Sequence, residues 1–357
     1  MKRWLEVLIP LGLASSACPA AVAQVSAQTR TFEGWTATCD NLKSCVVLAT
    51  AQDDIFYVRI SRAAGATAAP EVKIVLAAEE PQKGGAATFR LGALTDGTRV
   101  PLGPFPAAVA DDDSSIRVAS LAPGEKSLAF IEAIRNASTL EYAVLTAHGS
   151  LDLKGLAAAL RFIDAAQGRQ GTPTALVARG MTPISQVAPP PEPPVVVAAP
   201  VGSAAVVDKP TVTKALSDLA SAVCDPDVVK DQSEAMAWRL GADKVLVAVS
   251  CTQGAYNLGN ALYLTRLDGS EPKAVALPRP VPLDADEAAN VVVNASFDPK
   301  TMELTSLDKG RGLGDCGTSA TWVWDGQSFA LFEAAALENC PGSLPEDWPR
   351  LYSAKRK

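Results

Sequence analysis

Histidine is almost absent from this 357-residue sequence, and His148 is its single occurrence. Histidine performs most general-base catalysis near neutral pH, so its scarcity argues against the commonest catalytic constellations. His148 lies in the stretch TAHGSLD, for which we expect a solvated loop ahead of a helix. The sequence also lacks the GxSxG, SxxK and HExxH patterns, so nothing indicates the common exported acyl hydrolases.

Clusters of positive charge and long apolar runs are scarce as well. The net charge is −7, and the one block of three basic residues is the C-terminal tail Lys355-Arg356-Lys357. Nucleic acid and anionic lipid are therefore not expected as partners. Beyond the N-terminal region, no stretch reaches the roughly 18–20 uncharged apolar residues that a transmembrane helix needs, so we expect no transmembrane segment.

The N-terminus has the layout of a cleaved secretory signal. A short positive start precedes the mostly apolar stretch Leu5–Ala17, and Ala21-Val22-Ala23 provides a small-x-small cleavage site. We therefore predict that residues 1–23 are a signal peptide and that the mature chain is secreted to the periplasm. The alternative is lipoprotein processing at Cys18, although the leucine usually found three positions before such a cysteine is missing.

Six cysteines remain for pairing in the mature chain. An even number of cysteines in an exported protein is the usual signature of a disulfide framework. Six cysteines allow fifteen pairings, and the sequence favours pairs of neighbours: Cys39–Cys45, Cys224–Cys251 and Cys316–Cys340. A metal site or a redox-active pair is less well supported, because no CxxC motif occurs and the histidine is far from every cysteine. We expect neither a metal nor a cofactor.

A proline-rich segment divides the chain. Residues 187–210, VAPPPEPPVVVAAPVGSAAVVDKP, hold seven prolines and three charged residues. Such a composition predicts an extended, semi-rigid spacer. It separates residues 24–186 from residues 211–357, and each part is long enough to bury its own core. We therefore predict two α+β domains joined by a proline-rich linker.

Both parts are predicted to be mainly antiparallel sheet with a few flanking helices. For the first part, the patterns indicate strands at 55–61, 71–77, 87–92, 115–121 and 140–146, and helices at 125–135 and 153–167. For the second part, they indicate helices at 211–222 and 232–240, and strands at 245–251, 261–267, 273–278, 291–297 and 302–308.

A glycine-rich stretch, KGRGLGDCGTSATWVWDGQSF at 309–329, raises the possibility of a phosphate-binding loop. Such a loop needs its glycines between a buried strand and a helix, whose N-terminal amides hold the anion. Here the glycines are followed by an acidic residue, a cysteine and a β-branched, aromatic run that predicts a strand. A hairpin explains more residues, since Asp325-Gly326 favours a two-residue type I′ turn that would pair Trp324 with Gln327 and Trp322 with Phe329.

That register places both tryptophans on one face of the hairpin. The face is either part of the core or a platform for a sugar or peptide, with Arg311 and Asp315 as polar contacts. The burial of Trp322 and Trp324 distinguishes these two interpretations.

Two groups of carboxylates offer the remaining catalytic chemistry. The run Asp111-Asp112-Asp113 and the group Asp284, Asp286 and Glu287 both lie in polar contexts, where a solvated loop is the simplest interpretation. Neither group has the alternating ligand spacing of a twelve-residue calcium loop. A glycosidase that uses two distant carboxylates remains compatible with the sequence.

Several stretches resemble a bacterial exported family known as domain of unknown function 1176. The resemblance spans residues 30–352, and the stretches that carry it are CDNLKSC at 39–45, ALRFIDAAQGRQGTPTALVARG at 159–180, KGRGLGDCGTSATWVWDGQSFAL at 309–331 and DWPRLY at 347–352. Pro341 departs from the pattern, which has an arginine after the cysteine. The resemblance implies an exported, disulfide-containing envelope protein of a Gram-negative bacterium, and it implies no reaction, substrate or catalytic residue.

The leading functional hypothesis is a non-catalytic envelope protein that binds another protein or a cell-wall component. One alternative is a carboxylate-based hydrolase acting on envelope polysaccharide, and another is a structural or assembly factor without a small ligand. A cleft with two facing carboxylates would separate the hydrolase from the binding protein.

Overall fold

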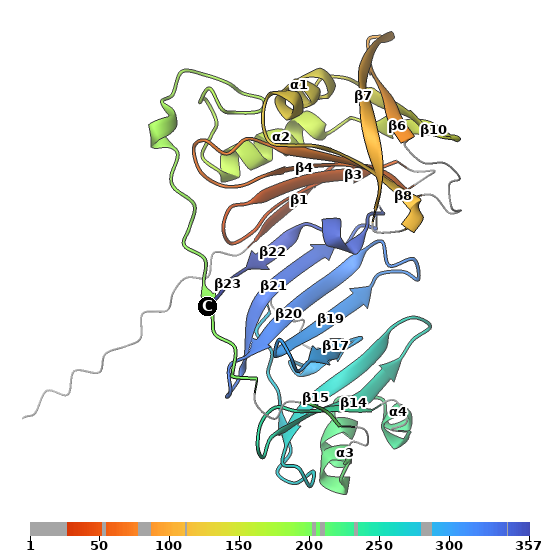
Figure 1. The fold of residues 1–357 in the computed structure, drawn as a ribbon, viewed down its shortest axis with the longest axis vertical. Helices are drawn as coiled ribbons and strands as arrows, with labels where there is room; N and C mark the ends of the chain where they lie inside the picture. Colours follow the sequence, from red (N-terminus) through yellow and green to blue (C-terminus); the bar gives the residue numbers. More distant parts are fainter. Residues whose placement is uncertain are drawn as a thin grey trace, which may run out of the picture.

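The computed structural model describes residues 27–51, 55–77, 87–110, 113–201, 205–207, 211–231, 235–279, 288–340 and 342–357. In this part of the chain, three large antiparallel sheets are stacked, with helices on the two outer sides of the stack (Figure 1). The chain is thus mainly β-structure with few helices, which confirms the predicted predominance of antiparallel sheet.

The first part of the chain forms a ten-stranded sheet in the order β1-β2-β3-β4-β5-β8-β7-β6-β9-β10. Its strands are β1 (Gln28–Phe32), β2 (Trp35–Cys39), β3 (Cys45–Thr50), β4 (Ile55–Arg62), β5 (Glu71–Ala77), β6 (Ala87–Thr95), β7 (Thr98–Ala110), β8 (Asp113–Leu121), β9 (Thr139–Val144) and β10 (Ala147–Asp152). Helices α1 (Glu125–Ile134) and α2 (Leu156–Ala166) cover one face of this sheet.

The second part of the chain forms two sheets. A five-stranded sheet contains β18 (Ser296–Asp298), β19 (Glu303–Lys309), β20 (Gly317–Trp324), β21 (Phe329–Leu337) and β22 (Arg350–Ser353). A six-stranded sheet contains β12 (Ala205–Val206), β13 (Met236–Arg239), β14 (Val245–Gln253), β15 (Leu258–Thr265), β16 (Lys273–Ala274) and β17 (Val291–Val293). Helices α3 (Lys214–Ser221) and α4 (Pro226–Lys230) lie at its outer side.

Successive side chains of a strand point to opposite sides of its sheet. Several strands are buried on both faces, because another layer of the protein packs on each side of their sheet. In β3, Val47 packs into the core under α2, whereas Val46 and Leu48 pack on the other side against the five-stranded sheet. In β14, Val247 faces α3 and α4, whereas Leu246 faces the five-stranded sheet. The five-stranded sheet is therefore the middle layer of the stack.

One hydrophobic cluster joins the two parts of the chain across this stack. It combines residues of the ten-stranded sheet with residues that follow the linker: Val46, Leu48, Tyr57, Val75, Ala335, Leu337 and Trp348. The two parts of the chain therefore share a core. That residues 24–186 and residues 211–357 fold independently stays a prediction.

Three disulfides brace the fold, with the pairing expected from neighbouring cysteines. Cys39–Cys45 joins β2 to β3, Cys224–Cys251 joins the α3–α4 connection to β14, and Cys316–Cys340 joins the start of β20 to the segment after β21. Each disulfide joins cysteines that are close in sequence, so each restricts only a short stretch of the unfolded chain.

Part of the predicted proline-rich linker is incorporated into sheets. Its strand β11 (Val195–Val196) pairs in parallel with β23 (Lys355–Arg356), and β12 pairs with β13. Both short strands lie at valine-rich positions of the linker, where β-propensity is high and no proline removes a backbone donor.

Several predictions of secondary structure differ from the structure. Strand β13 occupies positions for which a helix is predicted, because Ala237 and Trp238 are buried in the cores on opposite sides of the six-stranded sheet. Strand β7 is missing from the prediction because its prolines discourage a strand assignment. The β20–β21 hairpin pairs Trp324 with Phe329 through a four-residue turn, since the backbone N–H of Asp325 donates to Ser328 O.

Candidate functional site

The two tryptophans of the glycine-rich stretch lie in the core. Trp322 is 2% exposed and Trp324 is 1% exposed. The indole of Trp322 donates to the carbonyl of Pro278 at 2.7 Å, and the ring of Trp324 lies 5.0 Å from that of Phe329. The alternative of an exposed aromatic platform therefore does not fit the structure.

Arg311 and Asp315 pair with each other at the start of that stretch. Arg311 Nε donates to Asp315 Oδ1 at 2.7 Å, and a second bond joins Nη2 to Oδ2. The hydrogen bond from this arginine to the carboxylate raises the pKa of Arg311 above its ordinary value. The backbone N–H of Ser343 donates to the carbonyl of Asp315. The pair therefore closes the loop beside Cys316–Cys340, and it does not converge with the tryptophans on one surface.

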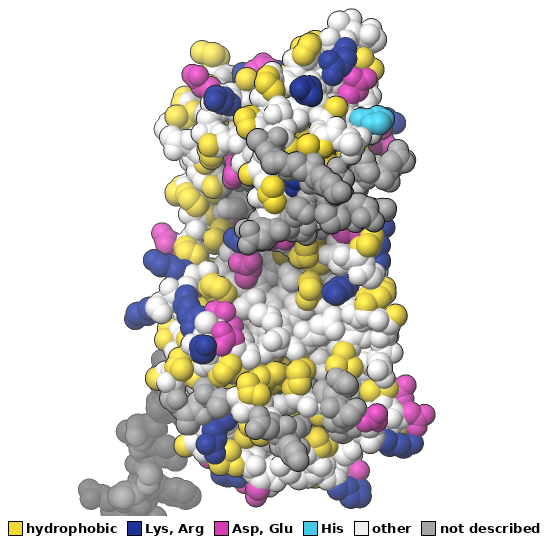
Figure 2. Space-filling view, turned by 45° about the vertical axis from the view of Figure 1, so that its right-hand side comes forward, with side chains coloured by type: hydrophobic (Ala, Val, Ile, Leu, Met, Phe, Trp, Pro, Cys, Tyr) yellow, Lys and Arg dark blue, Asp and Glu magenta, His cyan; other side chains and the backbone are white. Residues whose placement is uncertain are grey.

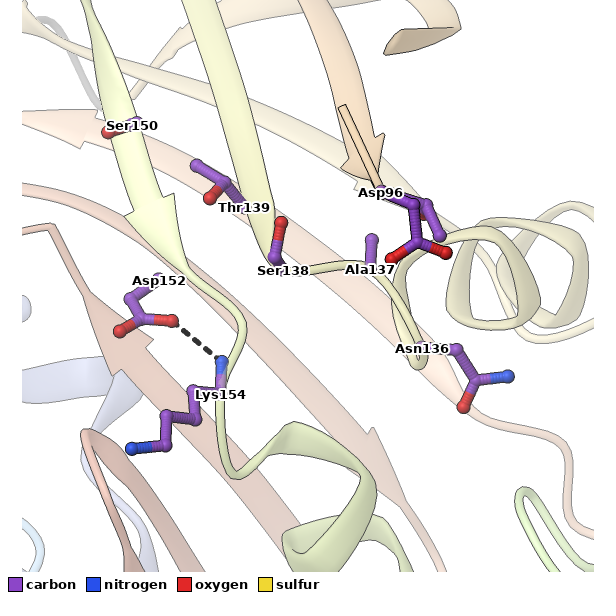
Figure 3. A pocket seen from close by; sticks show the side chains of 9 residues that line it. Asp96, Asn136, Ala137, Ser138, Thr139, Ser150, Asp152 and Lys154 are labelled. Carbon is purple, nitrogen blue, oxygen red and sulfur yellow. Dashed lines mark hydrogen bonds between the residues drawn. The ribbon is translucent and has the colours of Figure 1, made fainter. Parts of the chain in front are cut away.

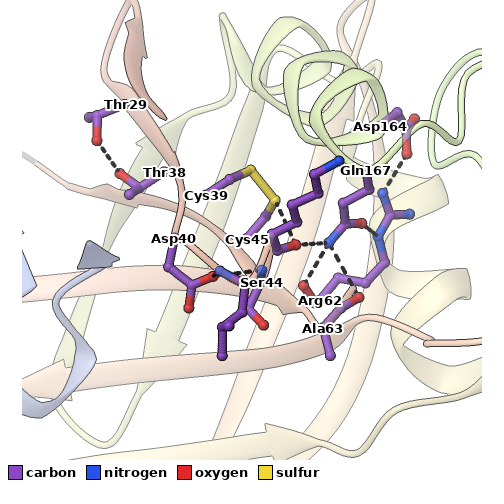
Figure 4. The surroundings of a disulfide bond; sticks show 12 residues. Thr29, Thr38, Cys39, Asp40, Ser44, Cys45, Arg62, Ala63, Asp164 and Gln167 are labelled. Carbon is purple, nitrogen blue, oxygen red and sulfur yellow. Dashed lines mark hydrogen bonds and ion pairs between the residues drawn. A yellow bond between two sulfur atoms is a disulfide. The ribbon is translucent and has the colours of Figure 1, made fainter. Parts of the chain in front are cut away.

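A buried polar network lies beside the Cys39–Cys45 disulfide (Figure 4). Arg62 and Asp164, whose side chains are fully buried, form an ion pair with Nη2 and Oδ1 2.7 Å apart. Gln167 accepts a bond from Arg62 Nε at 2.6 Å and donates to the carbonyl of Lys43 at 2.8 Å. Burial lowers the pKa of Arg62, an effect that the charge of Asp164 opposes.

The same network fixes the segment after α2. Asp164 accepts the backbone N–H of Leu176 at 2.8 Å, and Arg169 donates to the carbonyl of Ala68 at 2.9 Å. Sequence reasoning missed this arrangement, although its signal was present: Asp164 and Gln167 share the helix face of Leu160 and Ile163. Polar residues on an apolar helix face indicate a buried network.

A second polar cluster lies between the two parts of the chain. Asp347, in the 3₁₀ turn Pro345–Asp347, accepts hydrogen bonds from the hydroxyl of Tyr57 at 2.5 Å and from Nζ of Lys73 at 2.6 Å. Burial, and then the negative charge of Asp347, raise the pKa of Tyr57. Tyr57 therefore stays neutral and supplies a hydrogen-bond donor inside the shared core.

Most of the predicted carboxylate groups lie outside the part of the chain that the structure describes. Asp284, Asp286 and Glu287, like Asp111 and Asp112, lie outside the described residues. Within the described ranges, no three His, Cys, Asp or Glu side chains are grouped so that they could hold a metal ion.

Strand β10 is the last strand at one side of the ten-stranded sheet among the described residues, and it contains His148, which is therefore in a strand and not in a loop. Among the described residues β10 pairs with β9 alone. The ladder continues to the bond from Leu153 N to Ser138 O at 3.0 Å. In an antiparallel pair, alternate residues turn their backbone groups toward the partner strand. The N–H and C=O groups of His148 and Ser150 consequently point away from β9.

No described residue covers this edge at His148 to Ser150. His148, Gly149 and Ser150 are exposed, and in the described part of the chain the outward backbone groups of His148 and Ser150 have no hydrogen-bond partner. The strand carries neither the lysine nor the proline that commonly protects an edge from pairing with another chain. At its end, the carbonyl of Asp152 accepts a bond from the indole of Trp35 at 3.1 Å, which fixes the strand in place.

A polar pocket of about 560 Å³ adjoins the end of β10 (Figure 3). Two hydrogen bonds position residues that line it: Ser138 Oγ donates to the carbonyl of Leu94, and the backbone N–H of Lys154 donates to Asp152 Oδ1. Its lining is Thr95, Asp96, Asn136, Ala137, Ser138, Thr139, Ser150, Asp152 and Lys154. Ser150 belongs to both the edge and the lining of the pocket.

A more apolar hollow of about 630 Å³ lies between β7 and α1. It is lined by prolines of β7 together with Phe105 and Phe130, whose rings pack edge to face with centroids 5.6 Å apart. On the face of the molecule seen in Figure 2, acidic and basic side chains are interspersed among polar and hydrophobic ones.

These features define a mainly antiparallel β protein that is held together by disulfides, which indicate an oxidising, extracytoplasmic location. The chain belongs to the family described as protein of unknown function DUF1176, whose model matches residues 29–355. This membership confirms the resemblance noted in the sequence. None of the described helices is long and apolar enough to cross a membrane.

Two known proteins are similar to this chain. An uncharacterized protein of Escherichia coli (strain K12), YpfG, is 29% identical over 349 residues, which cover 94% of this chain and 95% of the relative. The crystal structure of invasion associated protein B from Bartonella henselae is 16% identical, with a TM-score of 0.27, and the match covers 40% of this chain and 99% of that one.

Proposed function

We propose that this protein is an exported, non-catalytic binding protein of the periplasm, and that it binds an extended peptide along β10. The peptide would belong to an envelope protein or to a cell-wall component. The observation that carries the proposal is the open edge at His148 and Ser150, whose backbone donors and acceptors face solvent. The disulfides and the predicted signal peptide support the location.

Binding would extend the ten-stranded sheet by one strand. An incoming segment can form two backbone hydrogen bonds with His148 and two with Ser150, in the alternating pattern of β-strand pairs. Each bond contributes about 0.5–1.5 kcal/mol after the exchange with water. The backbone therefore supplies affinity for any extended sequence without proline at the pairing positions.

The adjoining pocket would supply selectivity. A peptide side chain beside Ser150 reaches the pocket, whose polar groups include Asp96 and the carboxylate of Asp152. Lys154 Nζ lies 3.5 Å from Glu33 Oε1, so its charge is partly engaged. We propose that the pocket favours a polar side chain at this position of the peptide.

The test is a selection of random peptides on phage against the mature, oxidised protein and two variants. Ser150→Pro removes one outward N–H without removing a ladder bond to β9, and prolines are tolerated at such edge positions. Ser150→Ala removes the hydroxyl and keeps the backbone. Selected peptides should bind Ser150→Pro about three- to tenfold more weakly than the wild type, and Ser150→Ala within about twofold.

Equal binding to all three proteins would overturn the proposal, and so would the absence of any selected peptide. The melting temperature of each variant must match that of the wild type within a few degrees for the comparison to count. The hydrolase hypothesis has a separate test, since alanine at Asp284, Asp286 and Glu287 would abolish hydrolysis and leave peptide binding unchanged.

A further inference from the structure

The linker exposes more large apolar side chains than a spacer requires. Within the linker, Val195 is 59% exposed, and Val197 and Val201 are exposed as well. Just before the linker, Met181 is 93% exposed and Ile184 is also exposed. Exposed apolar side chains that occur singly need no explanation, but a continuous group of them marks an interaction site. The segment that carries these residues runs along one side of the stacked sheets (Figure 1).

Both ends of the exposed segment are fixed to the body of the protein. At one end, Val187 is buried directly after the 3₁₀ turn Ile184–Gln186. At the other end, the backbone N–H of Lys355 donates to the carbonyl of Pro194 at 2.7 Å, and Val196 is buried. The residues between these anchors are held in one place on the surface.

Residues 188–194, APPPEPP, have the composition of a polyproline II helix, which has three residues per turn and no internal hydrogen bonds. With this period, Pro190 and Pro193 share one edge. The ring of Pro190 lies beside Gly65 but is itself exposed, and Pro193 is half-buried. A second edge carries Pro189 and Glu192, which are both exposed. The third edge carries Pro191, which is half-buried, and Pro194, which is exposed.

We propose that residues 188–194, which lead directly into strand β11, are a preformed polyproline II ligand for a partner protein whose binding groove is lined by aromatic side chains. Aromatic rings pack on the flat faces of exposed prolines, which is the basis of recognition in known grooves of this kind. Because both ends of the segment are anchored, little conformational entropy remains to be lost on binding. The charge of Glu192 favours a groove with a basic side chain at its rim.

This surface is separate from β10, and its partner differs in chemistry, so the inference goes beyond the proposed function. The ligand here is the protein itself, and the groove belongs to the partner. Loss of peptide binding at β10 would leave this surface intact, and the two can be tested independently.

The test uses a photo-crosslinking amino acid at position Val195 of the full chain in its own cell envelope. The matched control places the same group at Leu267, which is 46% exposed and lies outside the linker. We expect a discrete adduct from position Val195 and none from Leu267. The attachment site on the partner, mapped by mass spectrometry, should lie among at least two aromatic residues.

Two changes probe the chemistry of the contact. Replacing Pro189, Pro191 and Pro194 together with serine should reduce the adduct at least about tenfold, and so should an excess of a synthetic peptide of residues 187–198. Glu192→Lys leaves every proline in place and should also reduce the adduct, which covers the case in which the triple variant is unstable. An adduct that is absent, insensitive to these changes or attached far from aromatic residues would overturn the proposal.

Discussion

The buried network at Arg62 and the edge strand β10 belong to the same ten-stranded sheet. The network pairs its polar side chains with one another, whereas the edge strand presents backbone groups on its outer side. Arg62, Asp164 and Gln167 satisfy one another in the interior, where an unpaired polar group is costly. Among the described residues, the outward backbone groups of His148 and Ser150 have no partner at the surface, where water or another chain can satisfy them. Groups that the protein satisfies internally serve the fold, and groups that it leaves open are available for binding.

The largest effect that separates the two regions is expected from Asp164→Ala. This change leaves Arg62 buried without its charge partner and leaves the N–H of Leu176 without its acceptor. Breaking a buried ion pair in this way costs about 3–5 kcal/mol. Chemical denaturation of the oxidised protein should measure that loss in the free energy of unfolding.

The matched control is Asp218→Ala, which removes an exposed i,i+4 pair with Lys214. Surface pairs of this kind contribute less than about 0.5 kcal/mol. If the two aspartates cost the same, the network would not have the structural role assigned to it.

A smaller effect is expected at the seam between the two parts of the chain. Tyr57→Phe removes the hydrogen bond to Asp347 and keeps the ring in the shared core. A hydrogen bond to a charged group contributes about 1.5–3 kcal/mol. Denaturation at neutral pH should show a loss within that range.

The pH dependence of the same variant sharpens the test. The pKa of Tyr57 is raised by burial, so the folded state holds the phenolic proton more tightly than the unfolded state does. This contribution to stability is complete below the unfolded tyrosine pKa of about 10 and is lost as the pH rises above it. Between pH 9 and 11, stability should therefore fall more steeply in the wild type than in Tyr57→Phe, and parallel curves would refute the assignment.

Limited proteolysis tests whether the shared core or the linker holds the two parts together. We predict cleavage between Val187 and Pro210, as the composition of the linker suggests, with two fragments that elute together from a sizing column. The cluster that includes Leu48 and Trp348 should keep them associated. Fragments that separate without denaturant would favour two independent domains with a weak interface.

The smallest effect on stability is expected at β10. Ser150→Pro should change the free energy of unfolding by less than about 1 kcal/mol, because the lost N–H faces solvent at a sheet edge. A larger loss would show that the N–H of Ser150 has a partner in the folded chain. In that case β10 would not be an open edge.

Local patterns predicted much of the sheet and little of the site. The strand at 71–77 is found with the predicted bounds, because its alternation and its flanking breakers act within the strand itself. The helix predicted at 125–135 matches α1, because the helical spacing of its buried residues is also a local pattern. Strand β13 depends on burial between two layers, and no local pattern carries that information.

The candidate site could not be predicted because it arises from sheet order. His148 and Ser150 look like loop residues in the sequence, and only the last position of β10 in the sheet exposes their backbone groups. The hairpin at Asp325-Gly326 shows a related limit. Its dipeptide favours a two-residue turn, yet the side chain of Asp325 accepts the N–H groups of Gln327 and Ser328 and stabilises a longer one.

The most direct measurement is amide hydrogen exchange at His148 and Ser150 with and without a peptide selected against the wild type. Strand addition predicts that both amides exchange at least about tenfold more slowly in the complex, because each donates to the added strand. Amides of Gly149 and Leu151, which already face β9, should change little by comparison. Unchanged exchange at His148 and Ser150, with protection elsewhere on the protein, would contradict the account.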